Sequence, residues 1–171
     1  MRRVHLFLLM ISLGYPMVAS VQGTVSFGPP ERAAIDNLFE GYSAAFSSRN
    51  YAKLREYIQA PFIRFGPSNT RVETTPSDWA VFGTMDDAIG FFRAAQEALS
   101  AQDVERFEWG QTRVTALSAD RALVNRTYRR YRNDGTLVME AASFYVVSKS
   151  SGSWKICGIL NQEPREFDKV H

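Results

Sequence analysis

The second half of the sequence constrains the fold most, because it contains four long segments of alternating apolar and polar residues joined by turns. The strongest turn signal is the Asn-Asp-Gly sequence at 133–135, since an Asp-Gly pair supplies the positive φ angles that a tight hairpin turn requires. It separates residues 121–132 from residues 136–149, which we expect to pair antiparallel. Residues 108–117 and 154–160 complete the predicted four-stranded meander.

Three helical segments precede this meander. Pro30 suits a helix start, and apolar residues then recur at helical spacing for about four turns; they are Ile35, Leu38, Phe39, Tyr42 and Phe46. A second helix is expected over residues 51–59 and should stop at Pro61, which cannot continue a helix. The third should begin at Thr84, which forms a variant capping box with Asp87, and end within residues 100–102.

Short extended segments are expected between the second and third helices. Residues 62–65 read as a strand, residues 66–69 as a turn and residues 71–75 as a second short strand. The predicted fold class is therefore α+β, with three N-terminal helices packed on one face of a curved antiparallel sheet. We expect this domain to span residues 31–161, with a polar tail over residues 162–171.

The N-terminus has the layout of a secretory signal peptide. Arg2 and Arg3 form a basic start, an apolar stretch follows to Val18, and Ala19 and Ser20 supply the small residues that a signal peptidase requires. The alternative is an uncleaved anchor, but the apolar stretch is shorter than the ~20 residues of a membrane span. We therefore predict a signal over residues 1–20, with cleavage after Ala19 or Gly23 as further options. The Gly- and Pro-rich residues 21–30 would be a linker, and the protein would be periplasmic or secreted.

Removal of the signal makes the chain formally neutral. The full sequence has 20 Lys+Arg and 18 Asp+Glu, and residues 1–20 contain two arginines and no acid, which leaves 18 of each. A neutral domain gives no reason to expect nucleic-acid binding. Cys157 is the single cysteine, so it cannot form an intramolecular disulfide; a buried thiol is expected, with an intermolecular bridge as the alternative.

The order of elements resembles the nuclear transport factor two-like superfamily, and in particular its SnoaL-like and ketosteroid-isomerase-like cone domains. Four pieces carry the resemblance: Tyr-Ser-Ala-Ala-Phe at 42–46, the helix at 84–99, Asp-Arg-Ala-Leu-Val at 120–124 and Gly-Ser-Trp-Lys-Ile at 152–156. The resemblance implies a cystatin-like cone with an apolar pocket between the helices and the sheet. It identifies a fold more than a function.

The resemblance also allows the isomerase chemistry to be compared residue by residue. In ketosteroid isomerases a tyrosine of the first helix donates a hydrogen bond to the forming oxyanion, and Tyr42 falls at that position. The two aspartates of those enzymes correspond to Gly66 and to the vicinity of Ser143. A tyrosine without a base cannot move a proton between carbon atoms, so steroid isomerase activity is not expected, and Tyr42 is the single catalytic candidate.

Histidine is present only as His5, in the predicted signal, and as His171, the last residue. The domain between them therefore lacks the histidine of Ser-His and Cys-His nucleophilic sites and of the Asp-His pair that dehydratases and cyclases of the superfamily use. We expect no metal site and no cofactor, because this domain has no internal histidine, a single cysteine and no glycine-rich phosphate loop.

A ligand pocket is the remaining candidate site. Residues that could point inward are mostly aromatic, with a few polar groups; the predicted ligand-binding residues are Tyr42, Phe46, Phe62, Trp79, Phe92, Arg126, Tyr128, Met139 and Ser143. Any single aromatic residue at such a position is more often ordinary core than a ligand contact, with Tyr42 nearer even odds because a buried phenol needs a hydrogen-bond partner. Such a pocket would suit a small hydrophobic molecule with one acceptor or acid group.

Two functions are weighed from the sequence, and a purely structural or accessory domain remains a third if side chains fill the cone. The first is an exported domain that binds a small hydrophobic molecule or acts as a dimeric interaction module. The second is a lyase or isomerase that uses Tyr42 with a carboxylate of Glu73, Asp78 or Glu140. Ala142, Phe144 and Val146 share the sheet face away from the helices, and their apolar character predicts a homodimer through that face.

Overall fold

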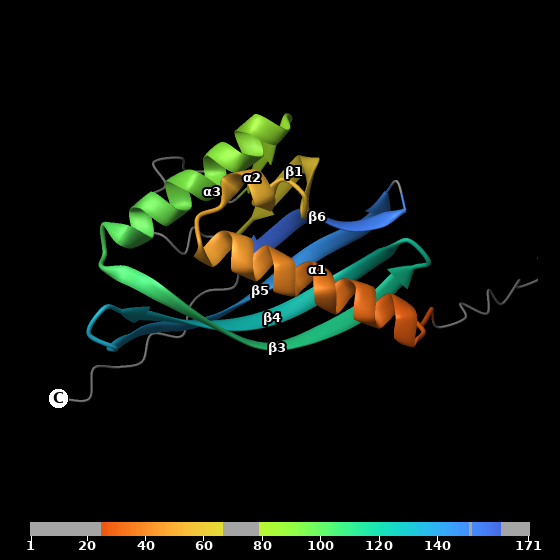
Figure 1. The fold of residues 1–171 in the computed structure, drawn as a ribbon. Coiled ribbons are helices and arrows are strands. Elements are labelled where there is room, and N and C mark those ends of the chain that lie inside the picture. Colours follow the sequence, from red (N-terminus) through yellow and green to blue (C-terminus); the bar gives the residue numbers. More distant parts are fainter. Residues whose placement is uncertain (1–24, 67–78, 151, 162–171) are drawn as a thin grey trace, which may run out of the picture.

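Helices cover one face of a curved six-stranded sheet in the computed structural model, which describes residues 25–66, 79–150 and 152–161 (Figure 1). In chain order the elements are α1 (Pro29–Ser47), α2 (Tyr51–Leu54), β1 (Ile58–Phe65), β2 (Trp79–Phe82), α3 (Met85–Ser100), β3 (Val104–Ser118), β4 (Arg121–Arg132), β5 (Leu137–Ser150) and β6 (Ser153–Asn161). No helix of the described ranges is long and apolar enough to span a membrane. The predicted signal, the strand at 71–75 and the polar tail lie outside the described residues.

The two long helices begin and bury the residues that the sequence predicts. Glu31 lies in the first turn of α1, and the predicted apolar stripe from Ile35 to Phe46 is buried. At the start of α3 the backbone N–H of Asp87 donates to Thr84 Oγ1 at 3.2 Å, and the backbone N–H of Thr84 donates to Asp87 Oδ2 at 3.2 Å. The predicted capping box is thus confirmed, and both helix starts follow local sequence signals.

The prediction of a helix over residues 51–59 is wrong beyond Leu54. The backbone N–H of Ile156 donates to the carbonyl of Tyr57 at 2.8 Å, and Ile58 already pairs with Ile156 in the sheet. Pro61 therefore lies inside β1 and does not end a helix. The β1–β6 register shifts between Ile58 and Ile63, so Pro61 occupies an irregular stretch where its missing N–H interrupts no regular pairing.

The sheet has the strand order β2-β1-β6-β5-β4-β3. The predicted meander of β3 to β6 is confirmed as antiparallel, and β3 begins at Val104, earlier than expected. The expectation of a fully antiparallel sheet is wrong at one pair, because β1 and β6 run parallel. The sheet is therefore mixed, and it joins the first strand of the chain to the last.

A bulge in β3 bends the sheet toward the helices. The β3–β4 register shifts between Trp109 and Thr112, and a Cβ atom at Gly110 would lie 2.1 Å from Thr127 Oγ1. A side chain at position 110 would therefore force Thr127 to shift, which favours glycine at this bulge. The bend brings Phe107 and Trp109 against α1, where Phe107 packs edge-on against Phe46 with ring centroids 5.4 Å apart.

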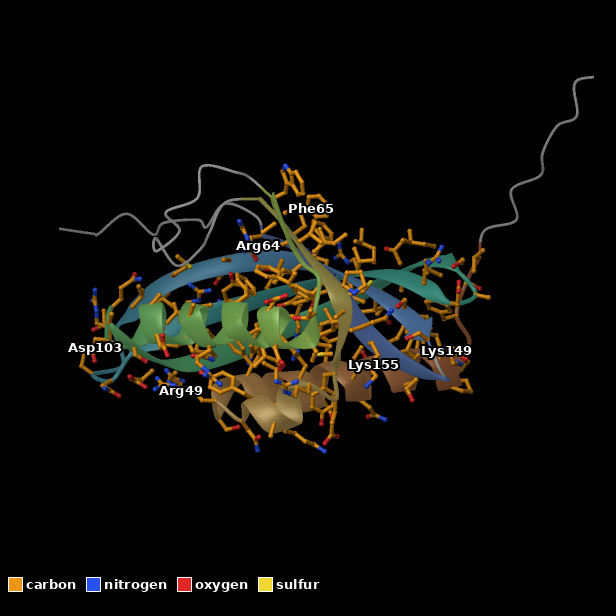
Figure 2. All side chains as sticks on the ribbon, turned by 90° about the horizontal axis from the view of Figure 1, so that it is seen from above. Arg49, Arg64, Phe65, Asp103, Lys149 and Lys155 are labelled. Atoms are coloured by element: carbon orange, nitrogen blue, oxygen red, sulfur yellow. The ribbon has the colours of Figure 1, made fainter. Side chains whose placement is uncertain are left out.

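The helices and the sheet are fastened at both ends of the molecule. Arg49 and Asp103, which both have left-handed backbone angles, lie at one end, and Lys149 lies at the other (Figure 2). Arg49 contacts Ser100 and forms an ion pair with Glu105 at 3.1 Å, while Lys149 Nζ lies 2.8 Å from Glu31 Oε1. Polar contacts therefore join the helices to the sheet at both ends of the molecule, and the apolar core packs between them.

Candidate functional site

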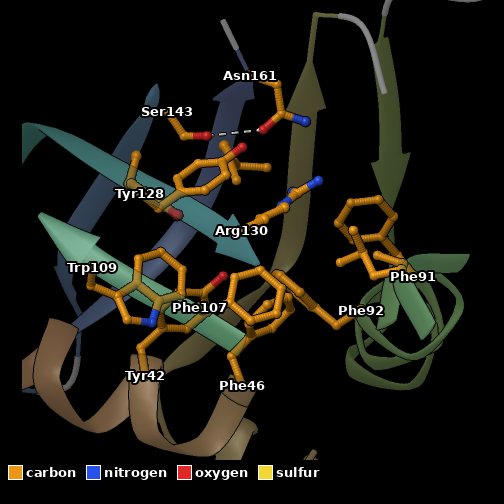
Figure 3. Close-up of a pocket in the computed structure, with 14 residues that line it drawn as sticks. Tyr42, Phe46, Phe91, Phe92, Phe107, Trp109, Tyr128, Arg130, Ser143 and Asn161 are labelled. Atoms are coloured by element: carbon orange, nitrogen blue, oxygen red, sulfur yellow. Dashed lines mark hydrogen bonds between the residues drawn. The ribbon is translucent and has the colours of Figure 1, made fainter. Parts of the chain in front are cut away.

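A cavity of about 60 Å³ lies between the inner face of the sheet and the helices α1 and α3 (Figure 3). Its lining combines aromatic rings with a few polar groups, and it is formed by Tyr42, Phe46, Phe91, Phe92, Ala95, Leu99, Phe107, Trp109, Tyr128, Arg130, Ser143, Tyr145, Ile159 and Asn161. The four strands β3 to β6 supply the sheet side. The site thus depends on the meander and on both long helices at once.

Tyr42 places a buried hydroxyl group at the aromatic end of the cavity. Its side chain is buried, and its ring lies 5.8 Å from that of Tyr145 and 6.1 Å from that of Phe92. Burial raises the pKa of Tyr42 well above its usual value, and the neighbouring Tyr145 phenol raises it further. Tyr42 is therefore neutral at physiological pH and can donate a hydrogen bond, but it is no general base.

The polar end of the cavity lies across from Tyr42. Ser143 Oγ donates to Asn161 Oδ1 at 3.1 Å, and Tyr128 lies beside them (Figure 3). Arg130 extends between this polar end and the aromatic end, with its guanidinium carbon 5.0 Å from the Tyr128 ring centre and 5.7 Å from that of Phe107. Burial lowers the pKa of Arg130, yet a guanidinium keeps its charge at neutral pH.

Arg126 lies behind the cavity wall. It is buried, and its Nη1 donates to the carbonyl of Phe39 at 3.0 Å and to Ser43 Oγ at 2.5 Å. Its guanidinium carbon also lies 4.9 Å from the Trp109 ring centre. Arg126 thus fastens β4 to α1 and holds Trp109 in place, and it does not line the cavity as the sequence suggested.

Five of the nine predicted ligand-binding residues line the cavity: Tyr42, Phe46, Phe92, Tyr128 and Ser143. Phe62 is buried behind Phe92, with ring centroids 5.3 Å apart, and Met139 is half-buried beside Arg130 in the sheet register. The expectation that Trp79 points inward is wrong, because its side chain is 58% exposed. Trp79 pairs with Phe65 on the outer face of the sheet, since β2 places Ala80 and Phe82 on the inner side.

Several lining residues are not among those predicted from the sequence, although alternation along a strand is enough to identify some of them. Arg130 follows Tyr128 by two positions on β4, and Tyr145 follows Ser143 by two positions on β5, so each shares its neighbour's face. Phe107 and Trp109 were harder to assign, because the β3 strand starts before the predicted boundary and the bulge at Gly110 resets the alternation.

Carboxylates are not part of the lining formed by the described residues. Glu140 faces the other side of the sheet, where the Nε of Arg129 lies 2.6 Å from Glu140 Oε2, so it cannot serve as a base for Tyr42. Glu73 and Asp78 lie outside the described residues. Within the described ranges, no group of three or more histidine, cysteine or acidic side chains is arranged to hold a metal ion.

Comparison with known proteins supports the fold described above. The family described as NTF2-like protein (DUF6841) matches residues 31–164. The chain belongs to this family. The superfamily suggested by the sequence is therefore confirmed. A search of curated proteins gave no significant match.

Solved structures share the fold of this NTF2-like protein at low sequence identity. An NTF2-like protein of unknown function from Pseudomonas putida KT2440 has a TM-score of 0.63 at 13% identity, covering 84% of this chain and 93% of its own. A ketosteroid isomerase-like protein from Erwinia carotovora atroseptica has a TM-score of 0.58 at 18% identity, covering 78% and 96%. A hexachlorocyclohexane dehydrochlorinase has a TM-score of 0.57 at 12% identity, covering 83% and 92%. Relatives of this fold thus include enzymes, but identities this low establish the fold alone.

Proposed function

We propose that this NTF2-like protein is an exported binding domain whose cavity takes up a small, largely apolar molecule with one polar group. The observation that carries the proposal is the composition of the cavity. Aromatic rings surround the neutral phenol of Tyr42, and Arg130 is the charged residue among the described residues that line the space. Apolar walls with a few convergent polar groups are typical of small-molecule sites.

The alternative, a lyase or isomerase, lacks support from the described residues. Such a reaction needs a group that accepts a proton, placed within hydrogen-bond reach of the substrate. Tyr42 has a raised pKa, Arg130 is a cation, and Glu140 is paired with Arg129 on the outer face of the sheet. The enzymatic relatives do not change this conclusion, because what they share with this chain is the fold.

The cavity volume limits the part of the ligand that can be enclosed. A volume of about 60 Å³ has room for about four to six water-sized groups at roughly 10–15 Å³ each. A short-chain or single-ring compound is favoured over a steroid-sized one. Half-buried lining residues such as Phe91 and Phe107 would allow a longer ligand to extend toward solvent.

Export and dimer formation are part of the proposal. The layout of residues 1–20 supports export, which would be tested by expressing the full chain in a bacterium and measuring the mass of the protein in the periplasmic fraction. The measured mass should correspond to a chain that begins at residue 20, 21 or 24. A chain with an intact N-terminus in the membrane fraction would contradict export by a cleaved signal. Dimer formation is supported by the apolar outer face of the sheet.

Ligand uptake is tested by native mass spectrometry of the protein purified from its own host, with a cavity-filling variant as comparison. Ala95 lines the cavity, whereas the neighbouring Ala94 is exposed on the same helix. We expect the wild type and Ala94→Leu to carry an added small mass, and Ala95→Leu to lose it because the new side chain fills the space. If Ala95→Leu keeps the added mass, the ligand is bound elsewhere. If none of the three carries one and Ala95→Leu is more stable than the wild type, the cavity is a packing defect.

A further inference from the structure

We propose that the cavity selects small carboxylates over neutral molecules of the same shape, with Arg130 as the group that holds the negative charge. This inference rests on the proposed binding function and adds the charge of the ligand to it. It depends on three features of the structure: the position of Arg130, the polar groups around it, and the charge of the strand that carries it.

Arg130 occupies the position that a ligand's charged end would reach. It lines the cavity between the aromatic end, formed by Tyr42 and Trp109, and the polar end, formed by Ser143 and Asn161 (Figure 3). Its side chain is 93% removed from solvent, with a relative exposure of 7%. A guanidinium offers five N–H donors in a planar fork, so a ligand carboxylate can be accommodated beside the contacts that Arg130 makes within the protein.

Hydroxyl groups accompany Arg130 among the described residues that line the cavity. The pKa of Arg130 is lowered by burial, and the groups that act against this shift are the phenols of Tyr128, Tyr145 and Tyr42. A phenol can donate a hydrogen bond to an anion as well as accept one. The charge of a bound carboxylate would therefore meet a cation and hydroxyl donors in a region of low dielectric constant, where such contacts are strong.

A second buried cation adds to the positive potential on the same strand. Arg126 shares the inner face of β4 with Tyr128 and Arg130, and its exposure is 8%. Its hydrogen bonds go to a carbonyl and a hydroxyl, and among the described residues no carboxylate forms an ion pair with it. Two buried guanidinium groups on one strand cost desolvation energy, and an anion in the adjacent cavity would offset part of it.

The apolar part of the ligand would then lie against the rings. Phe46, Phe92, Phe107 and Trp109 line the opposite end, and no acidic side chain of the described lining would repel the carboxylate. The chemical class that fits is a carboxylic acid with a short branched-chain or single-ring body. A neutral amide of the same shape would fill the same space without bringing a negative charge to Arg130, and this difference makes the inference testable.

The test compares two matched pairs of probes by NMR titration of the Trp109 indole signal at pH 7 and fixed ionic strength. Isobutyrate is compared with isobutyramide, and benzoate with benzamide. We expect each acid to bind at least about tenfold more tightly than its amide, because a hydrogen bond to a charged group contributes about 1.5–3 kcal/mol. Equal affinity of acid and amide would overturn the inference and leave the binding function intact. If none of the four probes binds and no ligand co-purifies, both the carboxylate preference and the proposed binding function are refuted.

Variants assign the preference to Arg130. Arg130→Gln should bind acid and amide within about twofold of each other, whereas Arg130→Lys keeps the charge and should retain part of the preference. Arg129→Gln is the matched control, because Arg129 precedes Arg130 on β4 but faces the outer side and pairs with Glu140. An acid preference that survives in Arg130→Gln, or that disappears equally in Arg129→Gln, would contradict the assignment. The wild-type comparison stands even if Arg130→Gln does not fold.

Discussion

At the scale of single residues, the buried phenols of Tyr42 and Tyr145 give the structure its clearest pH signature. Both pKa values are raised, in each case chiefly because burial removes the phenolate from water. The folded protein therefore holds both protons more tightly than the unfolded chain does. The stability that follows is fully present below about pH 10, the unfolded value, and is lost as the pH rises toward the folded pKa values.

We therefore predict a steep loss of stability above about pH 10. Each phenol that stays protonated in the folded state should contribute a slope of up to about 1.4 kcal/mol per pH unit to the free energy of unfolding. Urea unfolding between pH 8 and pH 11 measures the slope in the wild type, in Tyr42→Phe and in the double variant with Tyr145→Phe. The slope should decrease in two steps. An identical slope in the double variant would mean that neither phenol is shielded in the folded state.

The sequence identifies some of these site residues and misses others for a physical reason. Tyr42 is recognisable because it lies on the apolar stripe of α1, and Tyr128 and Ser143 follow from strict alternation on β4 and β5. The position of Trp79 is not predictable from the sequence, because an isolated aromatic residue carries no information about the face of the sheet that it occupies. That face depends on the pairing of β2 with β1, which only the folded sheet defines.

At the scale of elements, α3 depends on its first turn. Thr84 and Asp87 satisfy two backbone N–H groups that would otherwise lack partners, and the helix carries Phe91, Phe92 and Ala95 to the cavity. Near its other end, Gln96 Nε2 donates to the carbonyl of Phe46 at 2.7 Å and joins α3 to the C-terminal end of α1. A loosened first turn should therefore reduce stability without removing the contacts at the far end.

We predict that Thr84→Ala lowers the free energy of unfolding by about 1 kcal/mol, within the range of about 0.5–2 kcal/mol for the loss of such a cap. Thr84→Ser is the matched control, because it keeps the hydroxyl group and should change stability little. Urea unfolding gives the difference, and hydrogen exchange should be fastest in the first turn of α3. If Thr84→Ser destabilises as much as Thr84→Ala, the methyl group of Thr84 matters and the capping box does not.

Elements with local signals were predictable, and elements that depend on distant contacts were not. The capping box gives the start of α3, and the Asp-Gly turn gives the hairpin of β4 and β5. The residues after Leu54 have a helical pattern, but Ile58 is recruited into the sheet by pairing with Ile156. That pairing joins segments almost a hundred positions apart, and no local pattern reports it.

At the scale of the whole molecule, the parallel pairing of β1 and β6 builds an apolar surface on the outer face of the sheet. Phe65 pairs with Trp79 on one side and with Leu160 on the other, and all three side chains are at least 40% exposed. Leu160 in turn pairs with Phe144 of β5, which extends the surface toward the predicted dimer face. Exposed apolar surfaces on soluble domains often mark contact sites, so the arrangement supports a dimer centred nearer β1 than the sequence alone suggested.

We predict that the protein is a homodimer and that Phe65→Lys makes it monomeric, because a charge at the centre of the apolar surface would have to be buried without a partner. Leu117→Lys is the matched control: Leu117 is 54% exposed, at the end of β3, and Phe65 is 44% exposed. Gel filtration with light scattering over a range of protein concentrations measures the mass of each. At the same protein concentration, the wild type and Leu117→Lys should have the mass of two chains, and Phe65→Lys should have the mass of one. A monomeric wild type at all concentrations would refute the dimer, and a dimeric Phe65→Lys would move the interface away from this surface.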